Sequence, residues 1–431
     1  MDQAPSPPWP EDLLTERGIA FGNEALPVSS DPYQPAPAEL SSLRRASEAL
    51  GEAAERVCDA FPRDEALRTL FGYGRLQLEC VLKDPGYRPL IPLGRADSFV
   101  LPDGPRFLEY NTDGTAAWHY TSALTALWRE SAGLPPEEEP LPLRLLKTLL
   151  FCFRQWDRRG VERPRIAVVD WAEVGTREEQ EALAALFSSK GFPASVEDPR
   201  ALRLEGGRLT GPSGPVDLVY RRLVSEEAFS RSGEIRAFFD AYLGDAACFV
   251  GGFRTDPAWS KTLFAVLSDP AWHPLFPEEI RSALDRGVPW TRKVRGVPLA
   301  FKGDAAPALE VLIRHREELV IKPARGYEGR GVVAGAYCGE EEWEGEVKFA
   351  LAGGRYVVQE MVRPAPTAPA GGSPHYLQVG EYLLLGRLAG LLVRSSPTPL
   401  ITPQVREVFH PVGAEVSWAP FLHSGGPLAP L

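Results

Sequence analysis

The spacing of apolar positions predicts a long amphipathic helix near the start of the chain. Between residues 40 and 60 apolar side chains return every three or four positions, which places them on one helical face: Leu40, Leu43, Ala46, Leu50, Ala53, Val57 and Ala60. Similar spacing predicts helices at 64–82, 121–130 and 141–156. The proline-rich residues 1–37 are expected to be irregular.

A β-hairpin is predicted between these helices. Residues 97–101 and 106–111 are short strand-like runs, and the turn sequence Pro-Asp-Gly-Pro at 102–105 separates them. Two such runs around a turn dipeptide are typical of an antiparallel pair.

The middle of the chain predicts a parallel α/β unit. Residues 165–170 and 216–221 form apolar, strand-like runs, and residues 178–190 between them have helical spacing. A strand–helix–strand sequence over about 55 residues is typical of a parallel sheet. No GxGxxG follows the first strand, so a dinucleotide site is not expected there.

The last third combines strands with glycine-rich segments. Strands are predicted at 320–322 and 355–360, and the runs at 382–393 and 400–402 are expected to close the sheet. Residues 364–374, rich in proline and glycine, are expected to form a loop that orders over bound substrates. Three domains are therefore predicted: helices and hairpin (1–157), the parallel α/β unit (158–255) and the glycine-loop region (256–431).

Composition and charge narrow the class of protein. The chain has 431 residues, 44% of them hydrophobic, and its formal net charge is −11, which argues against a nucleic-acid groove. The five cysteines lie far apart without a CxxC pair, and the N-terminus has no apolar secretory segment. These features predict a cytoplasmic protein with reduced thiols that does not span a membrane.

A glycine loop suggests an anion site. Lys322 ends a predicted strand, and Gly326, Gly329 and Gly331 follow it. Glycines allow backbone N–H groups to turn toward an anion, and a lysine adds a positive charge for phosphate. A tight surface turn is the alternative interpretation of the same residues.

Polar residues on the predicted hairpin suggest a metal site. Asp97 faces Glu109 across the turn, Asn111 follows on the same face as Glu109, and Arg95 lies close by. Two carboxylates about 4 Å apart would repel by about 4 kcal/mol at an effective dielectric of about 20, so they need a cation or a shared proton. Removing either charge is therefore expected to raise the melting temperature slightly. A regular hairpin would pair residue 97 with 110, so a shared metal requires a bulge. A solvated hairpin face is the alternative.

Four sequence blocks occur in the order found in one enzyme family. They are Arg95-Ala-Asp97 with Glu109-Tyr-Asn111-Thr-Asp113, then Ser260-Lys261-Thr-Leu-Phe, then Ile321-Lys-Pro with Gly329-Arg-Gly-Val332 and Tyr356-Val-Val-Gln-Glu360, and finally 390–394 with 400–402. Together they resemble the glutathionylspermidine synthase-like, circularly permuted ATP-grasp ligases. The resemblance implies an α/β ATP-grasp fold with permuted order, which has antiparallel sheets and a small parallel α/β unit.

The resemblance also implies roles for individual residues. It implies Mg²⁺ ligands at Asp97, Glu109 and Asn111, and catalytic arginines at Arg95 and Arg394, beside the transferred phosphate. It implies ATP contacts from the two lysines, the glycine loop and the strand that follows: Lys261, Lys322, Gly326, Gly329, Gln359, Glu360 and Val362. Two positions depart from the family pattern, Tyr327 in the glycine loop and Ser395 beside Arg394.

These features predict an ATP-dependent carboxylate–amine ligase that forms an amide through an acyl phosphate. The substrates would be a small-molecule or peptide carboxylate and an amine, drawn from peptides, amino acids or polyamines. Neither a nucleic acid nor a membrane is expected as a partner. Two alternatives remain open: a regulatory protein that binds Mg-ATP without turnover, and a phosphotransferase on the same fold.

Overall fold

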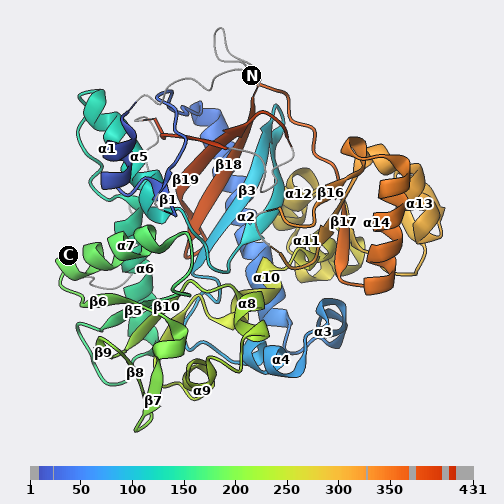
Figure 1. Ribbon diagram of the computed structural model, residues 1–431. Helices are drawn as coiled ribbons and strands as arrows, with labels where there is room; N and C mark the ends of the chain where they lie inside the picture. The colour runs from blue at the N-terminus through green and yellow to red at the C-terminus, as the bar shows by residue number, and fades with distance from the viewer. Residues whose placement is uncertain (1–8, 23, 327–328, 368–374, 400–406, 414–431) are drawn as a thin grey trace.

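A five-stranded antiparallel sheet forms the centre of the molecule (Figure 1). The computed structural model describes residues 9–22, 24–326, 329–367, 375–399 and 407–413. The strand order is β20-β19-β18-β3-β4, with bounds Val408–His410, Arg387–Ser396, Tyr376–Leu384, Leu93–Leu101 and Gly104–Asn111. Strands from the end of the chain thus join the N-terminal hairpin, so this sheet crosses the predicted division into 1–157 and 256–431.

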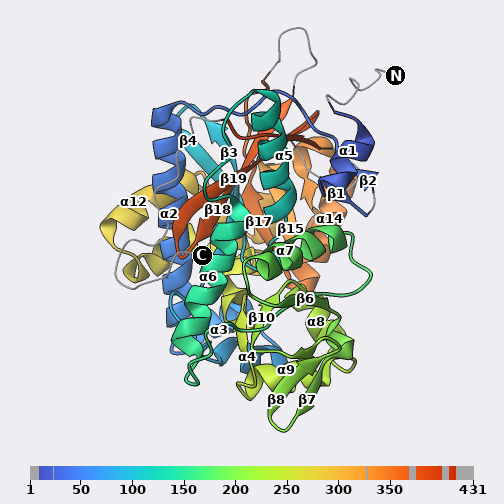
Figure 2. The ribbon, with the colours of Figure 1, turned by 90° about the vertical axis from the view of Figure 1, so that its left-hand side faces the viewer.

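Helices cover both faces of this sheet. The 24-residue helix α2 (Pro37–Ala60) packs on one face, where its apolar side meets Ala96, Val379 and Leu391. Helices α5 (Trp118–Ser131) and α6 (Leu141–Trp156) lie against the other face (Figure 2). They cover part of it, and the remainder of that face borders a cavity.

The predicted parallel α/β unit is confirmed. Its strand order is β11-β10-β5-β6 and all pairs are parallel, with bounds Cys248–Val250, Leu218–Arg221, Ile166–Val169 and Ala194–Glu197. Its helices are α7 (Arg177–Ser189), α8 (Ser225–Ser230) and α9 (Arg236–Leu243), and a small meander follows β6: β7 (Arg203–Glu205), β8 (Arg208–Gly211) and β9 (Gly214–Pro215). The sequence order 2-1-3-4 across the sheet places a topological switch point between β5 and β10.

A third unit carries the glycine loop. Its antiparallel sheet has the order β12-β17-β15-β16, with bounds Thr291–Lys293, Tyr356–Glu360, Leu319–Pro323 and Val333–Ala334. The hairpin β13 (Leu299–Phe301) and β14 (Asp304–Ala306) and the helices α13 (Ala308–Arg314) and α14 (Glu340–Gly353) complete it. Helices α10 (Asp256–Trp259), α11 (Thr262–Leu267) and α12 (Glu278–Gly287) connect this unit to the parallel one.

Three predicted elements differ from the structure. The helix at 64–82 is split into α3 (Glu65–Phe71) and α4 (Arg75–Leu82), because Gly72 takes a left-handed conformation (φ 66°) that ends α3. The run at 382–393 is a hairpin rather than one strand, with its turn at Leu385 and Gly386, both at positive φ. The segment before residue 37 is not wholly irregular: it contains α1 (Glu11–Glu16) and the pair β1 (Ala20–Phe21) and β2 (Glu24–Ala25). The predicted strand at 400–402 lies outside the described residues.

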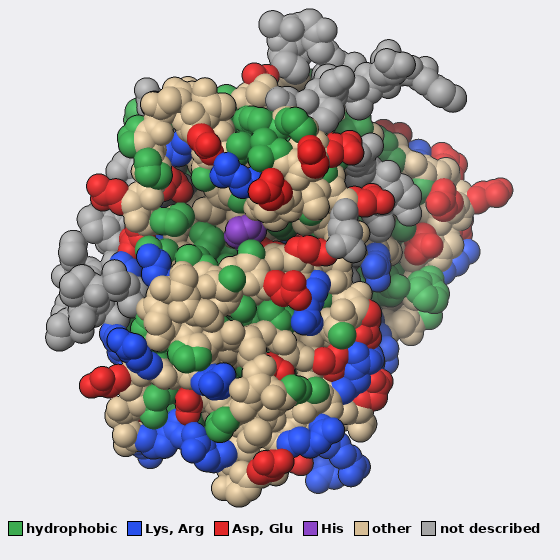
Figure 3. Space-filling model, turned by 60° about the vertical axis from the view of Figure 1, so that its left-hand side comes forward, with side chains coloured by type: hydrophobic (Ala, Val, Ile, Leu, Met, Phe, Trp, Pro, Cys, Tyr) green, Lys and Arg blue, Asp and Glu red, His purple; other side chains and the backbone are tan. Residues whose placement is uncertain are grey.

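The surface in Figure 3 carries lysine and arginine side chains interspersed with aspartate and glutamate. Across the described residues, no helix is both long and apolar enough to cross a membrane.

Candidate active site

A bulge in the β3–β4 hairpin sets the register of the predicted metal ligands. Asp97 pairs with Glu109 and Arg95 with Asn111, and the register shifts by one residue between Asp97 and Ser98. This is the irregularity that a shared metal site requires. All four side chains lie on the same face of the sheet, since side chains alternate along a strand.

Asp97 is almost fully buried, at 1% exposure, and is bound by arginines. Arg95 donates to both of its carboxylate oxygens, at 2.6 Å from Nε and 2.9 Å from Nη2. Arg394, from β19, approaches Oδ2 to 3.3 Å with Nη2. The negative charge of Asp97 is thus balanced within the protein.

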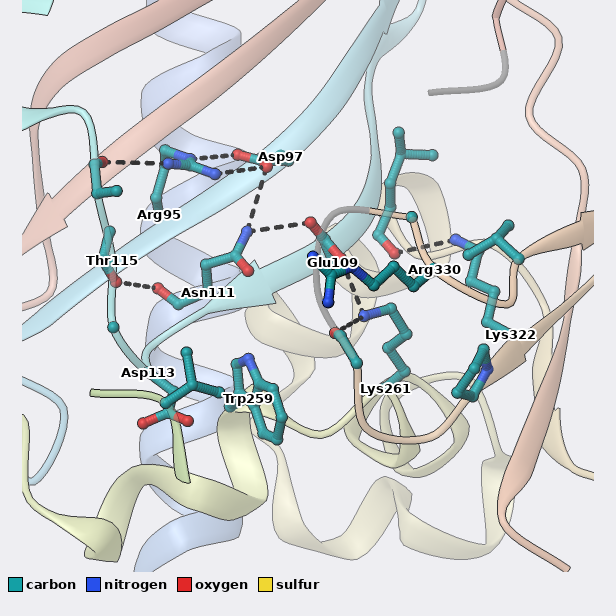
Figure 4. Close-up of a pocket in the computed structure, with 18 of the residues that line it drawn as sticks. Arg95, Asp97, Glu109, Asn111, Asp113, Thr115, Trp259, Lys261, Lys322 and Arg330 are labelled. Atoms are coloured by element: carbon teal, nitrogen blue, oxygen red, sulfur yellow. Dashed lines mark hydrogen bonds and ion pairs between the residues drawn. The ribbon is translucent and has the colours of Figure 1, made fainter. Parts of the chain in front are cut away.

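Asn111 connects the two acidic residues (Figure 4). Its Nδ2 donates to Asp97 Oδ2 and to Glu109 Oε1, each at 3.2 Å. Since one nitrogen lies 3.2 Å from both oxygens, the oxygens are at most twice that, 6.4 Å, apart. Asp97 and Glu109 are therefore close enough for a modest side-chain adjustment to bring both onto one ion.

Lys261 supplies the counter-charge for Glu109. Its Nζ lies 3.0 Å from Glu109 Oε2 and donates to the carbonyl oxygen of Gly326 at 2.9 Å. Burial alone would raise the pKa of Glu109, but the charge and hydrogen bond of Lys261, with a further contribution from Lys322, lower it to about 2. Glu109 is therefore ionised at neutral pH.

Lys322 extends from β15 toward the same region. Its Nζ donates to Gln359 Oε1 at 2.6 Å and to the carbonyl oxygen of Leu108 at 3.3 Å. Burial, followed by the nearby charge of Lys261, lowers the pKa of Lys322 to about 8, although Glu109 opposes the shift. A buried ammonium of this kind would be stabilised by an anionic ligand.

One cavity of about 740 Å³ brings together the residues that the sequence singled out. It lies where the central sheet, the parallel unit and the glycine-loop unit meet. All twelve predicted site residues line it: Arg95, Asp97, Glu109, Asn111, Lys261, Lys322, Gly326, Gly329, Gln359, Glu360, Val362 and Arg394. Their proximity is a finding of the structure, while their individual roles remain predictions.

The sequence patterns did not identify the residues that the parallel unit contributes to one end of this cavity. Asp170 and Trp171 follow β5, and Arg222 follows β10, so they flank the switch point between these strands. In open parallel sheets, ligands bind outside the carboxyl ends of the strands at such a point. No local motif marks these residues, because the two strand ends lie about 50 positions apart in sequence. Such a separation is expected, since two parallel strands must be joined by a long crossover connection.

Charged and polar groups at this end are largely buried. Arg222 pairs with Glu179 at 3.3 Å and is 2% exposed. Burial raises the pKa of Asp170 to about 6, although the charge of Arg222 opposes the shift. The indole N–H of Trp171 is buried without a hydrogen-bond acceptor among the described residues. Of these groups, Asp170, Trp171 and Arg222 line the cavity, so this end offers two ionisable side chains and an unused donor to a polar ligand.

Asp113, the last residue of the first sequence block, binds residues of the parallel unit rather than joining the proposed metal ligands. Its carboxylate forms a buried ion pair with Arg221 and accepts hydrogen bonds from the backbone N–H of Ser225, at 2.6 Å, and from its hydroxyl. It thereby ties the end of the metal-ligand hairpin to the parallel unit. Because Asp97 and Glu109 come from the hairpin, this contact helps to fix their position relative to Arg222.

The donor set fits Mg²⁺ in its chemistry. Carboxylates and an amide oxygen are ligands that Mg²⁺ accepts, and the ion usually retains waters and phosphate oxygens as well. Asn111 presents its NH₂ to both carboxylates, so its amide would have to turn to present oxygen. Over the described ranges, no cluster of three or more His, Cys, Asp or Glu side chains forms an alternative metal site.

The structure describes only one of the two residues that depart from the family pattern, Ser395 and Tyr327. Ser395 is on the face of β19 opposite Arg394, and its hydroxyl lies 2.8 Å from His410 Nε2, so it does not border the cavity. Tyr327 lies outside the described residues, as does most of the loop at 364–374.

Comparisons with known proteins reveal a related fold. No protein-family model and no curated protein matches the chain. A solved glutathione synthetase-like effector from Globodera pallida, in its apo form, has a TM-score of 0.60 at 15% identity, covering 93% of this chain and 94% of its own. D-alanyl-alanine synthetase A from Vibrio cholerae has a TM-score of 0.27 at 12% identity, covering 56% of this chain and 69% of its own, and a TM-score this low does not establish a shared fold.

The effector's likeness and the observed sheets confirm the predicted fold class. The protein has an ATP-grasp-like α/β fold with antiparallel sheets and a small parallel unit. Its acidic hairpin precedes its lysines and glycine loop in sequence, which is the permuted order that was expected.

Proposed function

We propose that the protein is an ATP-dependent carboxylate–amine ligase that forms an amide through an acyl phosphate. The observation that carries the proposal is the meeting of Asp97 and Glu109 with Lys261 and Lys322 in one cavity. These residues come from three sequence regions, and each type suits phosphoryl transfer. Acidic ligands hold a metal, and lysines balance the charge of the phosphates.

The nucleotide would occupy the end of the cavity formed by the glycine-loop unit. Residues 359–362 and Val320 border this end, and they offer backbone groups and apolar surface to an adenine. Lys261, Lys322 and the glycine loop would contact the phosphates. Asp97, Glu109 and Asn111 would hold Mg²⁺, which when bound would neutralise phosphate charge.

The acceptor substrates would extend toward the parallel unit. Asp170, Trp171 and Arg222 suit a polar molecule that carries charged groups, such as an amino acid or a peptide end. The reacting carboxylate would lie near Arg95 and Arg394, between this end and the phosphates.

In the first step, a carboxylate oxygen attacks the γ-phosphorus of ATP, a C–O–P linkage forms, and ADP leaves. The amine nitrogen then attacks the acyl carbon, the bond from this carbon to the phosphate oxygen breaks, and phosphate leaves as the nitrogen loses its proton. Arg95 and Arg394 would stabilise the negative charge on the acyl phosphate and on the tetrahedral species. No covalent bond to the protein is required.

A screen of ADP release tests the proposal. Purified protein with Mg-ATP is incubated with pools of amino acids, peptides and polyamines, and ADP is measured with each pool alone and with pairs of pools. We expect ADP release that depends on both an acid and an amine, with a new amide detected by mass spectrometry. ATP binding without ADP release under every condition would support the regulatory alternative, and a stable phosphorylated product would support the phosphotransferase.

A further inference from the structure

Lys261 connects the metal-ligand hairpin to the glycine loop. Its Nζ contacts Glu109 Oε2 at 3.0 Å and the carbonyl oxygen of Gly326 at 2.9 Å. Its backbone N–H also donates to the carbonyl oxygen of Ala324 at 2.8 Å. The residue is 9% exposed, so a single buried ammonium group holds both a proposed metal ligand and the loop proposed to bind phosphate.

The second carboxylate is held in the same way. Arg95 binds Asp97 through two hydrogen bonds, and Arg394 approaches it to 3.3 Å. Arg95, Lys261 and Arg394 therefore act as internal counterions of the two acidic ligands. A divalent cation at Asp97 and Glu109 would share these carboxylates with three cationic groups and would be repelled by them at short range.

Phosphate groups offer a way to remove this competition. A triphosphate in the cavity would give Lys261 other anionic oxygens to bind. Movement of the Lys261 ammonium to these oxygens would free Glu109 Oε2 and the Gly326 carbonyl at the same time. Both contacts depend on the same nitrogen atom, so they are released together.

We propose that, without nucleotide, these basic side chains occupy the carboxylates and prevent tight metal binding. Bound nucleotide would then draw Lys261 away from Glu109 and make this carboxylate available to the metal. The inference rests on the proposed function, because it assumes that this cavity binds Mg²⁺ and a nucleotide. Metal and nucleotide then bind with positive coupling, and by linkage each raises the affinity for the other by the same factor.

Manganese binding to the nucleotide-free protein tests the proposal directly. Free Mn²⁺ is measured by electron paramagnetic resonance during titration of the wild type, Lys261→Met, Lys261→Arg and Lys83→Met. Lys261→Arg keeps the positive charge, and Lys83 pairs with Asp245 on α9's side of the molecule, outside the cavity. Circular dichroism and melting curves verify that each variant is folded.

The wild type, Lys261→Arg and Lys83→Met are expected to bind Mn²⁺ weakly. Lys261→Met is expected to bind it at least about tenfold more tightly, because the competing charge beside Glu109 is gone. Adding Glu109→Gln to Lys261→Met should abolish the gain. This pattern separates competition for the ligand from a structural role of Lys261, which would alter the melting temperature without tightening metal binding.

Two results would overturn the proposal. One is an equal Mn²⁺ affinity in folded Lys261→Met and wild type. The other, which needs no variant, is wild-type Mn²⁺ binding without nucleotide that is as tight as with a non-hydrolysable ATP analogue. If either occurs while ADP release still depends on an acid and an amine, the coupling is wrong and the ligase function stands.

Discussion

Each of the two acidic residues of the site is paired with at least one basic residue. Asp97 is bound by Arg95 and Arg394, and Glu109 is bound by Lys261. The sequence suggests two carboxylates that repel each other, whereas the structure surrounds them with cations. The expected rise in melting temperature on removing a carboxylate is therefore revised, since each removal takes a counterion from a basic side chain that is largely shielded from water: Arg95 for Asp97 and Lys261 for Glu109.

Asp97→Asn tests this revision. We expect turnover to fall by at least about a hundredfold, since a metal ligand is lost. Stability should fall by about 2 kcal/mol, because the partly buried Arg95 loses its carboxylate partner, whereas Arg394 retains its ion pair with Glu407. Steady-state kinetics and denaturant unfolding measure the two effects. Glu138→Gln, in an acidic run away from the cavity, serves as the control and should change neither quantity. An increase in stability for Asp97→Asn would contradict the ion-pair account.

The lowered pKa of Lys322 leads us to expect that nucleotide binding depends on pH. Its pKa is lowered to about 8 by burial and by Lys261, and bound phosphate would raise it again. The protonated form binds the anion, so affinity is nearly full below about pH 7, is about half of that near pH 8, and falls by about a further fivefold between pH 8 and pH 9. Calorimetric titration with a non-hydrolysable ATP analogue measures this change. Lys322→Met should bind weakly with no such decline, and an unchanged decline in that variant would assign it to another group.

Some of these residues could be predicted from sequence and others could not. Asp97, Glu109 and the glycine loop form local patterns in which spacing alone indicates a shared face or an anion-binding turn. Asp170 and Arg222 carry no such pattern, because only the pairing of β5 with β10 brings them together. The ion pair of Lys261 with Glu109 joins segments about 150 residues apart, and such a contact depends on tertiary packing.

At the scale of elements, the bulged hairpin controls the geometry of the site. The shift between Asp97 and Ser98 places Asp97 opposite Glu109, and β18 lies directly beside Asp97 with Gly380 as its neighbour. Only the last three residues of β18, from Tyr382 onward, lie in the apolar run from which a strand is predicted. Its pairing with β3 was not predictable, since a local pattern does not identify a strand's neighbour.

Gly380 gives a test at this scale. A β-carbon there would lie 2.9 Å from Arg95 Cδ and 2.9 Å from Asp97 Oδ1, so Gly380→Ala must displace the ion pair. We expect kcat/KM to fall at least about tenfold while the fold is retained. Gly345→Ala, in α14, is the matched control: its β-carbon meets no atom within 4 Å, and alanine should stabilise the helix by about 0.5–1 kcal/mol. Equal activities of Gly380→Ala and wild type would show that the ion pair tolerates displacement.

At the level of the whole molecule, the cavity is formed by three units, and the chain returns to the first of them, the central sheet, after building the other two. The hairpin contributes the acidic ligands, the parallel unit contributes Asp170 and Arg222, and the glycine-loop unit contributes Lys322. A ligand that bridges these units should stabilise the entire fold, because it binds only when all three are in place.

Thermal unfolding measures this stabilisation. Mg-ATP at a hundredfold its dissociation constant should add about 2.7 kcal/mol, which corresponds to about 3 °C in melting temperature for a chain of this length. Lys322→Met should lose most of the shift, whereas Lys83→Met should keep it. The absence of any shift with millimolar ATP, ADP or AMP analogues would contradict nucleotide binding in this cavity.

Oxygen labelling tests directly whether the acid is activated as an acyl phosphate. Once the screen identifies an acid and an amine, the acid is prepared with ¹⁸O in its carboxylate, and the products are analysed by mass spectrometry. We expect each amide formed to be accompanied by ADP and by a phosphate that carries one ¹⁸O from the carboxylate. Unlabelled phosphate, or AMP carrying the label, would contradict activation as an acyl phosphate, because the oxygen would then have come from water or passed through an acyl adenylate.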